Sequence, residues 1–380
     1  FMKHKKLFIA LTCVLSFFAA IFIFLTIWFW GDRYADLNNN FRKEFSIEGL
    51  KDGAVPQGMG NCEVKIDNAT EQYFFTSAYM KNGSASRIYV TGADSGYIGY
   101  VTMKNVDGSD YKGHCGGLAT NGDYLWVTGE DNVYVTKNTG DTTVTQDIVT
   151  RAKESGSIQF TASFAANCGA DFCYYFATKS SKTGRLYIGE FYRKGTYDKA
   201  HHRATTKNGY ENHAYMYEYN VTNSGDYGLT LLSGDKLNKY VPKIQNVISI
   251  PEKIQGAAFS GRTTNGASNG TLLLSQSYSL ANSHIYSFNW NKVNAYHEIT
   301  TLKYDGITKN NADYYEDANM FFADLNDKDM LINDYSLPSM SEGMCTVNNR
   351  VYVLFESGCK KYSLFVREKM KNVYSFIPRK

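Results

Sequence analysis

The sequence predicts an all-β fold, a β-propeller of five or six blades that follows one N-terminal transmembrane helix. Short apolar runs recur between turns rich in Gly, Asn and Ser, which tolerate unusual backbone angles and therefore bound strands. The same cadence of three strands occurs five times. Three of the five prolines, Pro56, Pro251 and Pro338, stand just before a repeat, where a strand tolerates proline. Five copies in order favour radial repetition, which also protects sheet edges.

The clearest repeat covers residues 254–288. It opens with Gln255 and Gly256, passes through a Gly/Asn-rich turn to an apolar strand at 272–274, and ends on a strand around Ile285 and Tyr286. Its opening recurs as Gln57-Gly58-Met59, Cys115-Gly116-Gly117, Gln159-Phe160-Thr161 and Glu342-Gly343-Met344. The second strand recurs at 73–76, 125–128, 174–178 and 351–355, and the third at 86–91, 132–137, 184–189 and 360–365.

Residues 1–30 differ in composition from the rest of the chain. Lys3, Lys5 and Lys6 precede an uncharged run at 7–30, and about 20 apolar residues span a bilayer as a helix. The run is longer than the ~7–15 apolar residues of a cleaved signal peptide, and its basic flank is N-terminal. We therefore expect a cytoplasmic flank (1–6), a signal anchor in the cell membrane (7–30), a stalk with a closing strand (31–54) and an extracellular propeller (55–380). Phe45 to Ile47 are the candidate for the strand that completes the last blade.

Two insertions interrupt the repeats. Residues 193–214 extend blade three, and residues 305–329 form an acidic insertion after blade four with room for a short helix. Apolar segments at 229–232 and 247–250 leave room for a sixth, degenerate blade. The sequence therefore leaves the blade count open between five and six.

Six cysteines follow the predicted anchor, an even number for a compartment that oxidises thiols. Three disulfides are therefore expected. Cys168 and Cys173 flank a four-residue turn and can pair across a hairpin. Six cysteines allow 15 connectivities, so the remaining pairs are less determined. The other expected pairs are Cys62 with Cys115 and Cys345 with Cys359.

Propeller geometry predicts the ligand site without a motif. The start of each innermost strand and the loop after each second strand lie on one face, around the mouth of the central channel, and convergent polar groups at a concave mouth are the default ligand site. The alternative is that these side chains only satisfy neighbouring backbone amides, because buried polar groups need partners. The predicted set is Gln57, His114, Gln159, Gln255 and Glu342 from the strand starts, with Ser77, Glu130, Lys179, Gln276 and Glu356 from the loops.

At Ser341-Glu342-Gly343, and in the cadence between Pro56 and Val366, the chain resembles the lactonase and gluconolactonase type of propeller, which includes strictosidine-synthase-like proteins. The resemblance implies a divalent metal held at the channel by a Glu, two Asn and an Asp. Glu342 matches that Glu, whereas the other openings carry Gln or Cys at this place. The patterns Q-G-x-A-x-S at 255–260 and L-L-S-x-S-Y at 273–278 are more similar to uncharacterised exported bacterial propellers.

Two further groups of residues are weak metal candidates, because imidazole is a common metal ligand and hard cations such as calcium take several oxygens. The acidic group lacks the central Gly and terminal Glu of an EF-hand, so no cofactor is expected, and calcium is the alternative. The groups are His201, His202 and His213, and Asp324, Asn326, Asp327 and Asp329.

The net charge of +3 is small and the basic residues are scattered, which argues against a nucleic-acid partner. The sequence instead favours a binding or scaffold module at the cell surface, for a glycan, a peptide or an envelope protein. The competing class is a metal-dependent hydrolase that uses Glu342 at the central channel. Four oxygens about 2.3–2.6 Å from one point beside Glu342 would favour the enzyme. A mouth lined by amides and aromatic side chains would favour binding.

Overall fold

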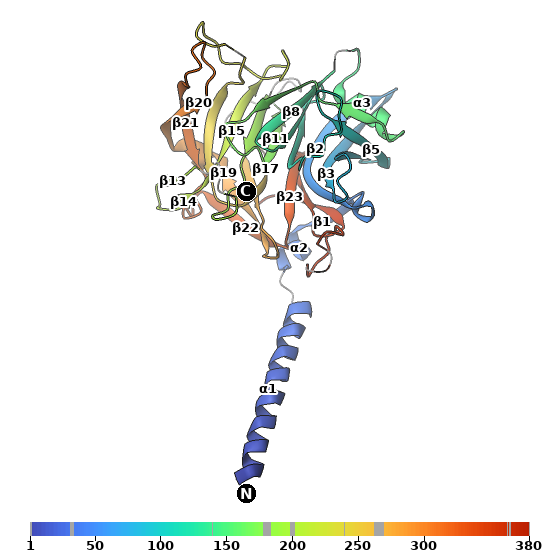
Figure 1. Cartoon of the computed structure of the whole chain (residues 1–380), viewed down its shortest axis with the longest axis vertical. Helices are drawn as coiled ribbons and strands as arrows, with labels where there is room; N and C mark the ends of the chain where they lie inside the picture. The colour runs from blue at the N-terminus through green and yellow to red at the C-terminus, as the bar shows by residue number, and fades with distance from the viewer. Residues whose placement is uncertain are drawn as a thin grey trace.

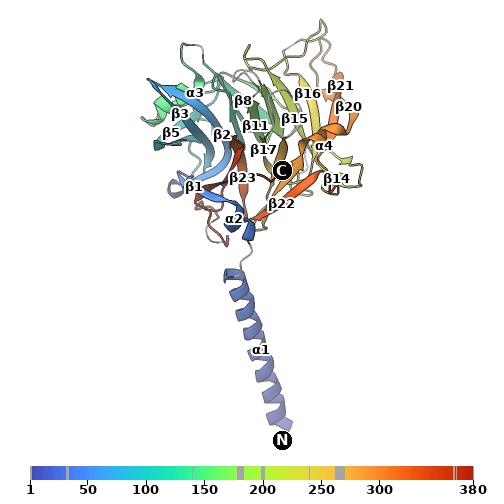
Figure 2. The same ribbon diagram turned by 180° about the vertical axis from the view of Figure 1, so that it is seen from behind.

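Five β-sheets surround a common axis (Figures 1 and 2). The structure is a computed structural model that describes residues 2–30, 34–138, 140–177, 184–197, 202–238, 240–261, 270–362, 364 and 366–379. The innermost strands contact one another in the ring order β2, β6, β11, β17, β23 and back to β2. The fold is therefore a five-bladed β-propeller, and the chain is all-β apart from short helices and the N-terminal helix.

Three of the five blades are four-stranded and blade one has a fifth, short strand, and the strands of each run outward from the innermost one. Blade one holds β2 (Ala54–Ile66), β3 (Ala69–Met80), β4 (Arg87–Gly92) and β5 (Gly96–Lys104), and blade two holds β6 (Gly117–Thr120), β7 (Tyr124–Gly129), β8 (Asn132–Lys137) and β10 (Ala162–Ala165). Blade four holds β17 (Ile254–Ser260), β18 (Thr271–Gln276), β19 (Ser283–Asn289) and β22 (Leu331–Leu337), and blade five holds β23 (Ser341–Val347), β24 (Arg350–Phe355), β25 (Asn372–Phe376) and β1 (Arg42–Ser46). A short strand, β9 (Ser157–Gln159), is added to β5 in parallel.

Blade three is larger than the others because its sheet is extended by an insertion that lies between β19 and β22 of blade four. Its own strands are β11 (Phe172–Ala177), β12 (Gly184–Gly189), β15 (Ala214–Val221) and β16 (Ile244–Ile250). A hairpin of β20 (His297–Tyr304) and β21 (Tyr314–Phe322) extends this sheet through parallel pairing of β21 with β16. A short helix, α4 (Trp290–Ala295), precedes the hairpin, whereas the helix expected within residues 305–329 is not formed, because β21 occupies much of that segment. Because segment 247–250 belongs to β16, the sixth blade is not formed.

The predicted three-strand repeat holds in blades one, two and four and is shifted in the other two. Segment 174–178 was expected to be a second strand, but β11 is the innermost strand of blade three. In blade five, residues 360–362 and 364 lie outside any strand, and β25 is the third strand instead. The loop between β24 and β25 folds back through turns, with Cys359 N donating to Glu356 O at 3.0 Å, so the chain reaches the sheet again only at Asn372.

Glycine is the shared residue of the predicted blade openings because the innermost strands pack backbone against backbone. At four of these glycines a Cβ atom would come within 3 Å of the main chain of the neighbouring blade, so a side chain has no space. The distances from the ideal Cβ are 2.4 Å to Leu118 N for Gly58, 2.2 Å to Cys173 N for Gly117, 2.8 Å to Glu342 O for Gly256 and 2.6 Å to Met59 N for Gly343.

Strand positions follow from local sequence. Residues 272–274 of β18 are fully buried leucines, as expected for a strand that is covered on both faces by neighbouring blades. The β7–β8 hairpin turns at Glu130 and Asp131, whose φ angles of 57° and 64° match a type I′ turn. Helix α3 (Val144–Ala152) begins with a capping box formed by Thr143 and Gln146.

The N-terminal strand closes the ring. β1 pairs antiparallel with β25 and forms the outer edge of blade five, which is where the candidate closing segment at Phe45 was expected. The preceding Phe41 is 9% exposed, and its ring lies 4.4 Å from that of Phe376 and 5.7 Å from that of Tyr335. The first and last parts of the propeller sequence are thereby held in one sheet.

All five innermost strands run in the same direction, which distinguishes two ends of the propeller. We call the end where they begin the proximal face and the end where they finish the distal face. The chain joins the body at the proximal face through helix α2 (Ala35–Asn40), because Asp36 Oδ2 accepts the amide of Ser336 at 3.0 Å and Tyr34 OH lies 3.4 Å from Asn282 Oδ1. In Figures 1 and 2 helix α1 (Met2–Trp30) leaves from this side, opposite α3. Hairpin β13 (Ala204–Thr205) with β14 (Glu211–Asn212) and the turn η1 (Leu50–Asp52) also lie there.

Helix α1 is apolar along its described side chains, residues 11–26. Leu15, Phe18 and Phe22 are about 60–70% exposed, and none of them packs on the propeller. Taking only the residues that were described in full, no helix combines the length and the apolarity that define a membrane span.

The expected disulfides are not formed, and all cysteines are free thiols. Cys345 lies opposite Tyr352 in the β23–β24 pair, whereas Cys359 follows Phe355, which lies opposite Ser341. Four strand positions of about 3.3 Å separate Cys345 from Ser341, and Cys359 lies in the turn beyond that end of the strand pair, where it is a free thiol.

The other two expected pairs are wrong for related reasons. Cys62 lines a cavity at the distal face, whereas Cys115 is buried at the proximal face, where its carbonyl accepts the Ser77 hydroxyl at 2.8 Å. Cys173 is on β11 and its thiol donates to Trp126 O at 3.8 Å, across the interface with blade two. Its side chain is therefore engaged away from the loop that carries Cys168.

Candidate ligand-binding site

A buried carboxyl pair lies at the proximal face. Glu342 at the start of β23 and Glu356 just after β24 share a side-chain hydrogen bond, and Glu342 is 2% exposed. Burial and the neighbouring Glu356 carboxylate raise the pKa of Glu342 well above the ordinary carboxyl range. Burial also raises the pKa of Glu356 to about 7, against the opposing effects of Gln57 and Lys361. Of the two carboxyls, Glu342 therefore holds a proton more firmly, and its O–H donates a hydrogen bond to Glu356.

Three other side chains surround this pair. Gln57 Nε2 donates to Glu356 Oε2 at 2.9 Å and to Pro56 O at 2.7 Å. The His114 ring stacks on Tyr79 with 5.0 Å between centroids, and desolvation by the surrounding protein, followed by the charge of Lys361, lowers the pKa of His114 to about 4. The structure thus joins Gln57, Glu342 and Glu356 in one buried hydrogen-bonded network, whereas His114 stacks on Tyr79 and is exposed to solvent.

The remaining predicted residues of blades two to four are more dispersed. Gln276 Nε2 donates to Glu252 O at 2.8 Å, and its Oε1 accepts the Tyr286 hydroxyl at 2.9 Å. Gln255 is half-buried on β17, and Glu130 is exposed in the β7–β8 turn. Ser77 accepts the amide of Gly58 at 3.0 Å and so joins adjacent strands. Lys179 lies outside the described residues.

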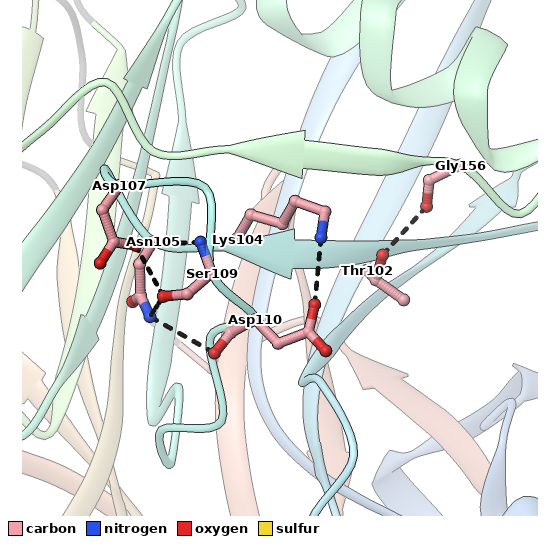
Figure 3. Close-up of polar contacts among 7 residues, drawn as sticks. All are labelled: Thr102, Lys104, Asn105, Asp107, Ser109, Asp110 and Gly156. Atoms are coloured by element: carbon pink, nitrogen blue, oxygen red, sulfur yellow. Dashed lines mark hydrogen bonds and ion pairs between the residues drawn. The ribbon is translucent and has the colours of Figure 1, made fainter.

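Gln159 is not at the channel, which corrects its prediction. It lies on β9, which pairs with the outer strand of blade one, and its side-chain amide donates to Val106 O at 2.9 Å. Figure 3 shows the adjoining edge, where Thr102 Oγ1 donates to Gly156 O at 3.3 Å and Lys104 forms an ion pair with Asp110 at 3.1 Å. The apolar run around Gln159 resembles a blade opening in sequence. It lies at the outer edge of blade one because β9 pairs with β5.

Asp171 occupies the position that was assigned to Gln159, at the start of the innermost strand of blade three. Burial raises its pKa to about 7, although Oδ2 accepts the amide of Phe191 at 2.6 Å. The neighbouring Glu190 is 2% exposed, and its Oε1 lies 2.6 Å from His202 Nδ1. Burial raises the pKa of Glu190, whereas His202 lowers it. The sequence feature that could have identified Asp171 is the Gly169-Ala170-Asp171 turn, because it directly precedes the apolar strand β11.

The weak metal candidates have other roles. Asp324 is buried and accepts Asn208 Nδ2 at 3.1 Å and the amide of Asn326 at 2.9 Å, so it ties the insertion of blade three to the loop after β21. His213 stacks on Tyr192, with 5.2 Å between the ring centroids, and His201 lies outside the described residues. Among the described residues, no three His, Cys, Asp or Glu side chains are grouped so that they could hold a metal ion.

A cavity of about 580 Å³ opens at the distal face. All five blades contribute, because the ends of the five innermost strands and the turns that follow them line it. Its wall includes Tyr174, Tyr175 and Phe176 of β11 and Phe259 of β17. Tyr174 OH donates to Phe259 O at 3.2 Å, and the Tyr175 ring stacks on Trp126 at 6.0 Å, so the aromatic wall is held in place.

Amide side chains form the other walls of this cavity. Asn349 Oδ1 accepts the amide of Gly261 at 3.0 Å, and Asn121 Nδ2 donates to Asn223 Oδ1 at 2.6 Å. Asn348 and Asn349 have φ angles of 48° and 65°, a left-handed conformation that asparagine tolerates well. The charged lining residues are Glu63, Lys65 and Asp123, two acidic side chains and one basic one, which leave one net negative charge.

Sequence reasoning missed this site because it assigned the binding mouth to the proximal face. The relevant residues were interpreted only as turn formers between the first and second strands of each blade. The shared signal was an Asn-containing turn at that place, as in 121–123 and 348–349. The mouth lined by amides and aromatic side chains is therefore present, at the opposite end of the propeller.

Comparison with known proteins bears on the fold alone. No protein-family model matches the chain, and no curated protein is similar to it. Among solved structures, the WD40 domain of Toxoplasma gondii coronin is similar with a TM-score of 0.30 and 8% identity, over 83% of this chain and 68% of that chain. Since a likeness of this size carries no argument about function, strand pairing and ring closure are the basis for describing the chain as a five-bladed β-propeller.

Proposed function

We propose that this protein is a membrane-anchored binding module and that the distal cavity is its ligand site. The observation that carries the proposal is the position of the cavity, which is built by all five blades at the end opposite the point where the chain joins the body. A concave, largely preformed pocket with apolar walls and a few oriented polar groups is the usual form of a small-ligand site.

The anchoring role of α1 is supported by its sequence and by its surface. The run at 7–30 carries no charged residue, and large apolar side chains from Leu11 to Leu25 are exposed around the helix. A helix that is apolar on all sides is stable when it is buried, and a bilayer supplies that environment. With α1 in the cell membrane and the basic flank inside, the distal cavity would face outward from the cell surface.

The chemistry of the cavity favours a neutral glycan as ligand. Tyr175 and Phe176 offer flat apolar surfaces, and Asn61, Asn121 and Asn349 offer amide donors and acceptors. The lining carries two acidic side chains and one basic one, which disfavours an anionic ligand and gives little attraction for a strongly cationic one. A sugar has both apolar faces and hydroxyl groups, so it matches both kinds of wall.

Binding of neutral oligosaccharides by the full chain in nanodiscs tests this proposal. Tyr175→Ala removes an aromatic wall, and we expect it to weaken binding roughly tenfold, which corresponds to about 1.4 kcal/mol. Tyr315→Ala is the matched control, because this tyrosine is 59% exposed on outer strand β21. Failure of the wild-type chain to bind any neutral oligosaccharide, or equal affinities for wild type and Tyr175→Ala, would contradict the proposal.

A further inference from the structure

A second cavity, of about 560 Å³, lies at the proximal face beside blade five. Two segments form it, residues 46–52 before β2 and part of the loop from Gly358 to Lys371. Four lysines line it together with two acidic side chains, Glu48 and Asp52. The lysines, all exposed to solvent, are Lys51, Lys360, Lys369 and Lys371.

The backbone of this cavity is fixed by the closure of the ring. Ser46 pairs with Asn372 in the β1–β25 ladder, and Ile47 N donates to Lys371 O at 2.9 Å. On the opposite wall, a Cβ on Gly358 would lie 2.2 Å from Met370 O, so the loop packs tightly on itself. The main chain that carries the lysines is therefore hydrogen-bonded at Lys371 and closely packed at Gly358.

The two acidic side chains offset only part of the positive charge of this cavity. Within the described part of the chain, no ion pair involves Lys51, Lys369 or Lys371. Burial, with Asp52 second, raises the pKa of Glu48, whereas Lys51 lowers it, and four lysines face only two carboxyl groups in the lining. The cavity is thus a positively charged recess that suits an anionic group.

The recess lies on the side of the body from which the N-terminal helix leaves. Only three residues separate Trp30 at the end of α1 from Tyr34, which contacts the body, and four peptide steps reach at most about 14 Å. Figure 1 shows the dark red loop between β24 and β25 reaching below the body on the side of α1. In the same loop Leu364 is 89% exposed, between the lysines of the recess.

We propose that this lysine-lined recess binds the phosphate headgroups of anionic lipids in the membrane that holds α1, with Leu364 entering the interface. The inference rests on the proposed anchoring role of α1. Lysine acts as a point charge toward phosphate, and basic residues next to a membrane segment are attracted to anionic leaflets. An apolar side chain among lysines is the usual composition of a peripheral membrane contact. The propeller is thereby held with its proximal face on the bilayer and its distal cavity outward.

The test uses the full chain in vesicles, with Leu364→Cys labelled by an environment-sensitive dye and Cys13→Ser to remove the other exposed thiol. We expect a blue shift of the dye emission in vesicles that contain phosphatidylglycerol and a smaller shift in phosphatidylcholine alone. High salt should abolish the difference because it screens exposed charges. The chain with Cys13→Ser alone reports background labelling.

Charge reversal identifies the residues responsible. Lys360→Glu, Lys369→Glu and Lys371→Glu together should abolish the lipid-dependent shift. The matched control reverses three exposed lysines elsewhere, Lys153→Glu, Lys236→Glu and Lys309→Glu, and should retain it. Thermal unfolding of both triple variants establishes that each is folded. A shift that persists in the recess variant, or that is equal in both lipids, overturns the inference.

Flotation of the same vesicles separates this inference from the proposed anchor. A chain that floats with both lipid compositions but shows no phosphatidylglycerol-dependent shift retains the anchor and loses the lipid-binding recess. A chain that does not float with either composition contradicts the anchor. The two failures are therefore distinguished within one preparation.

Discussion

At the scale of single residues, the proximal network depends on a proton shared by Glu342 and Glu356. Both carboxyls are buried, and the pKa of Glu356 is raised to about 7 from 4.5. A group with a raised folded-state pKa stabilises the fold below its unfolded value and loses that effect as the pH rises through its folded value. The free energy of unfolding is therefore expected to fall between about pH 4.5 and the region above pH 7.

Glu342→Gln tests this origin of the pH dependence. An amide donates to Glu356 without needing a proton, so the variant should lose less stability at high pH than the wild-type chain, by on the order of 2 kcal/mol. The decrease of the free energy of unfolding with rising pH should be reduced rather than removed, because burial also raises the pKa of Asp171 to about 7. Melting temperatures from circular dichroism at pH 5 and pH 8 measure the effect. Glu130→Gln, an exposed carboxyl, is the control, and an unchanged slope in Glu342→Gln would exclude the shared proton as the cause.

At the scale of secondary-structure elements, the ring depends on how closely the innermost strands approach. Gly343 on β23 faces the backbone of β2, where its missing Cβ would lie 2.6 Å from Met59 N. A clash with main-chain atoms is not relieved by rotating a side chain, so one strand must move. The glycine that recurs in the blade openings is thus a packing requirement and not only a turn signal.

Gly343→Ala is expected to lower the free energy of unfolding by roughly 1–3 kcal/mol, the usual cost of overpacking. Denaturant unfolding followed by tryptophan fluorescence measures the change. Gly140→Ala is the matched control, since its Cβ would meet only Asn138 Oδ1 at 3.6 Å. Equal unfolding midpoints for the two variants would show that the β2–β23 interface adapts without cost.

At the scale of the whole molecule, closure joins the start of the propeller sequence to its end. β1 completes blade five, and Phe41 seals the junction against Tyr335 of blade four and Phe376 of blade five. The same closure positions the proximal lysine recess, because its two walls come from residues 46–52 and 358–371. Stability and the orientation of the body therefore depend on one interface.

Phe41→Ala should destabilise the propeller by about 3–5 kcal/mol, the usual cost of removing a buried phenylalanine. Because the ring opens at this junction, limited proteolysis is expected to cut between β25 and the C-terminus faster than in the wild type. Tyr97→Ala, at a ring that is 46% exposed, is the control. Proteolysis at the wild-type rate in Phe41→Ala would mean that β1 does not hold the ring closed.

Local sequence was sufficient where hydrophobic runs and turns lie within one blade. The strands of blades one, two and four and the β7–β8 hairpin follow from such runs, since neighbouring segments pair with each other. Prediction was wrong where the partner is distant in sequence: Gln159 pairs with β5, and β21 pairs with β16 of another blade. The disulfides were also mispredicted, because the number of cysteines carries no information about their separation in the ring.

The sequence by itself determined that the chain forms repeated strands around an axis, that glycine opens most blades, and that an apolar segment precedes them. These properties are local, because strand periodicity and turn chemistry act over a few residues. Only the tertiary structure decided which end of the propeller carries the cavity that all five blades line, that Glu342 and Glu356 share a buried network, and which lysines meet at the proximal face. Those outcomes depend on contacts between blades, and the position of one blade against the next is set by backbone packing around the closed ring.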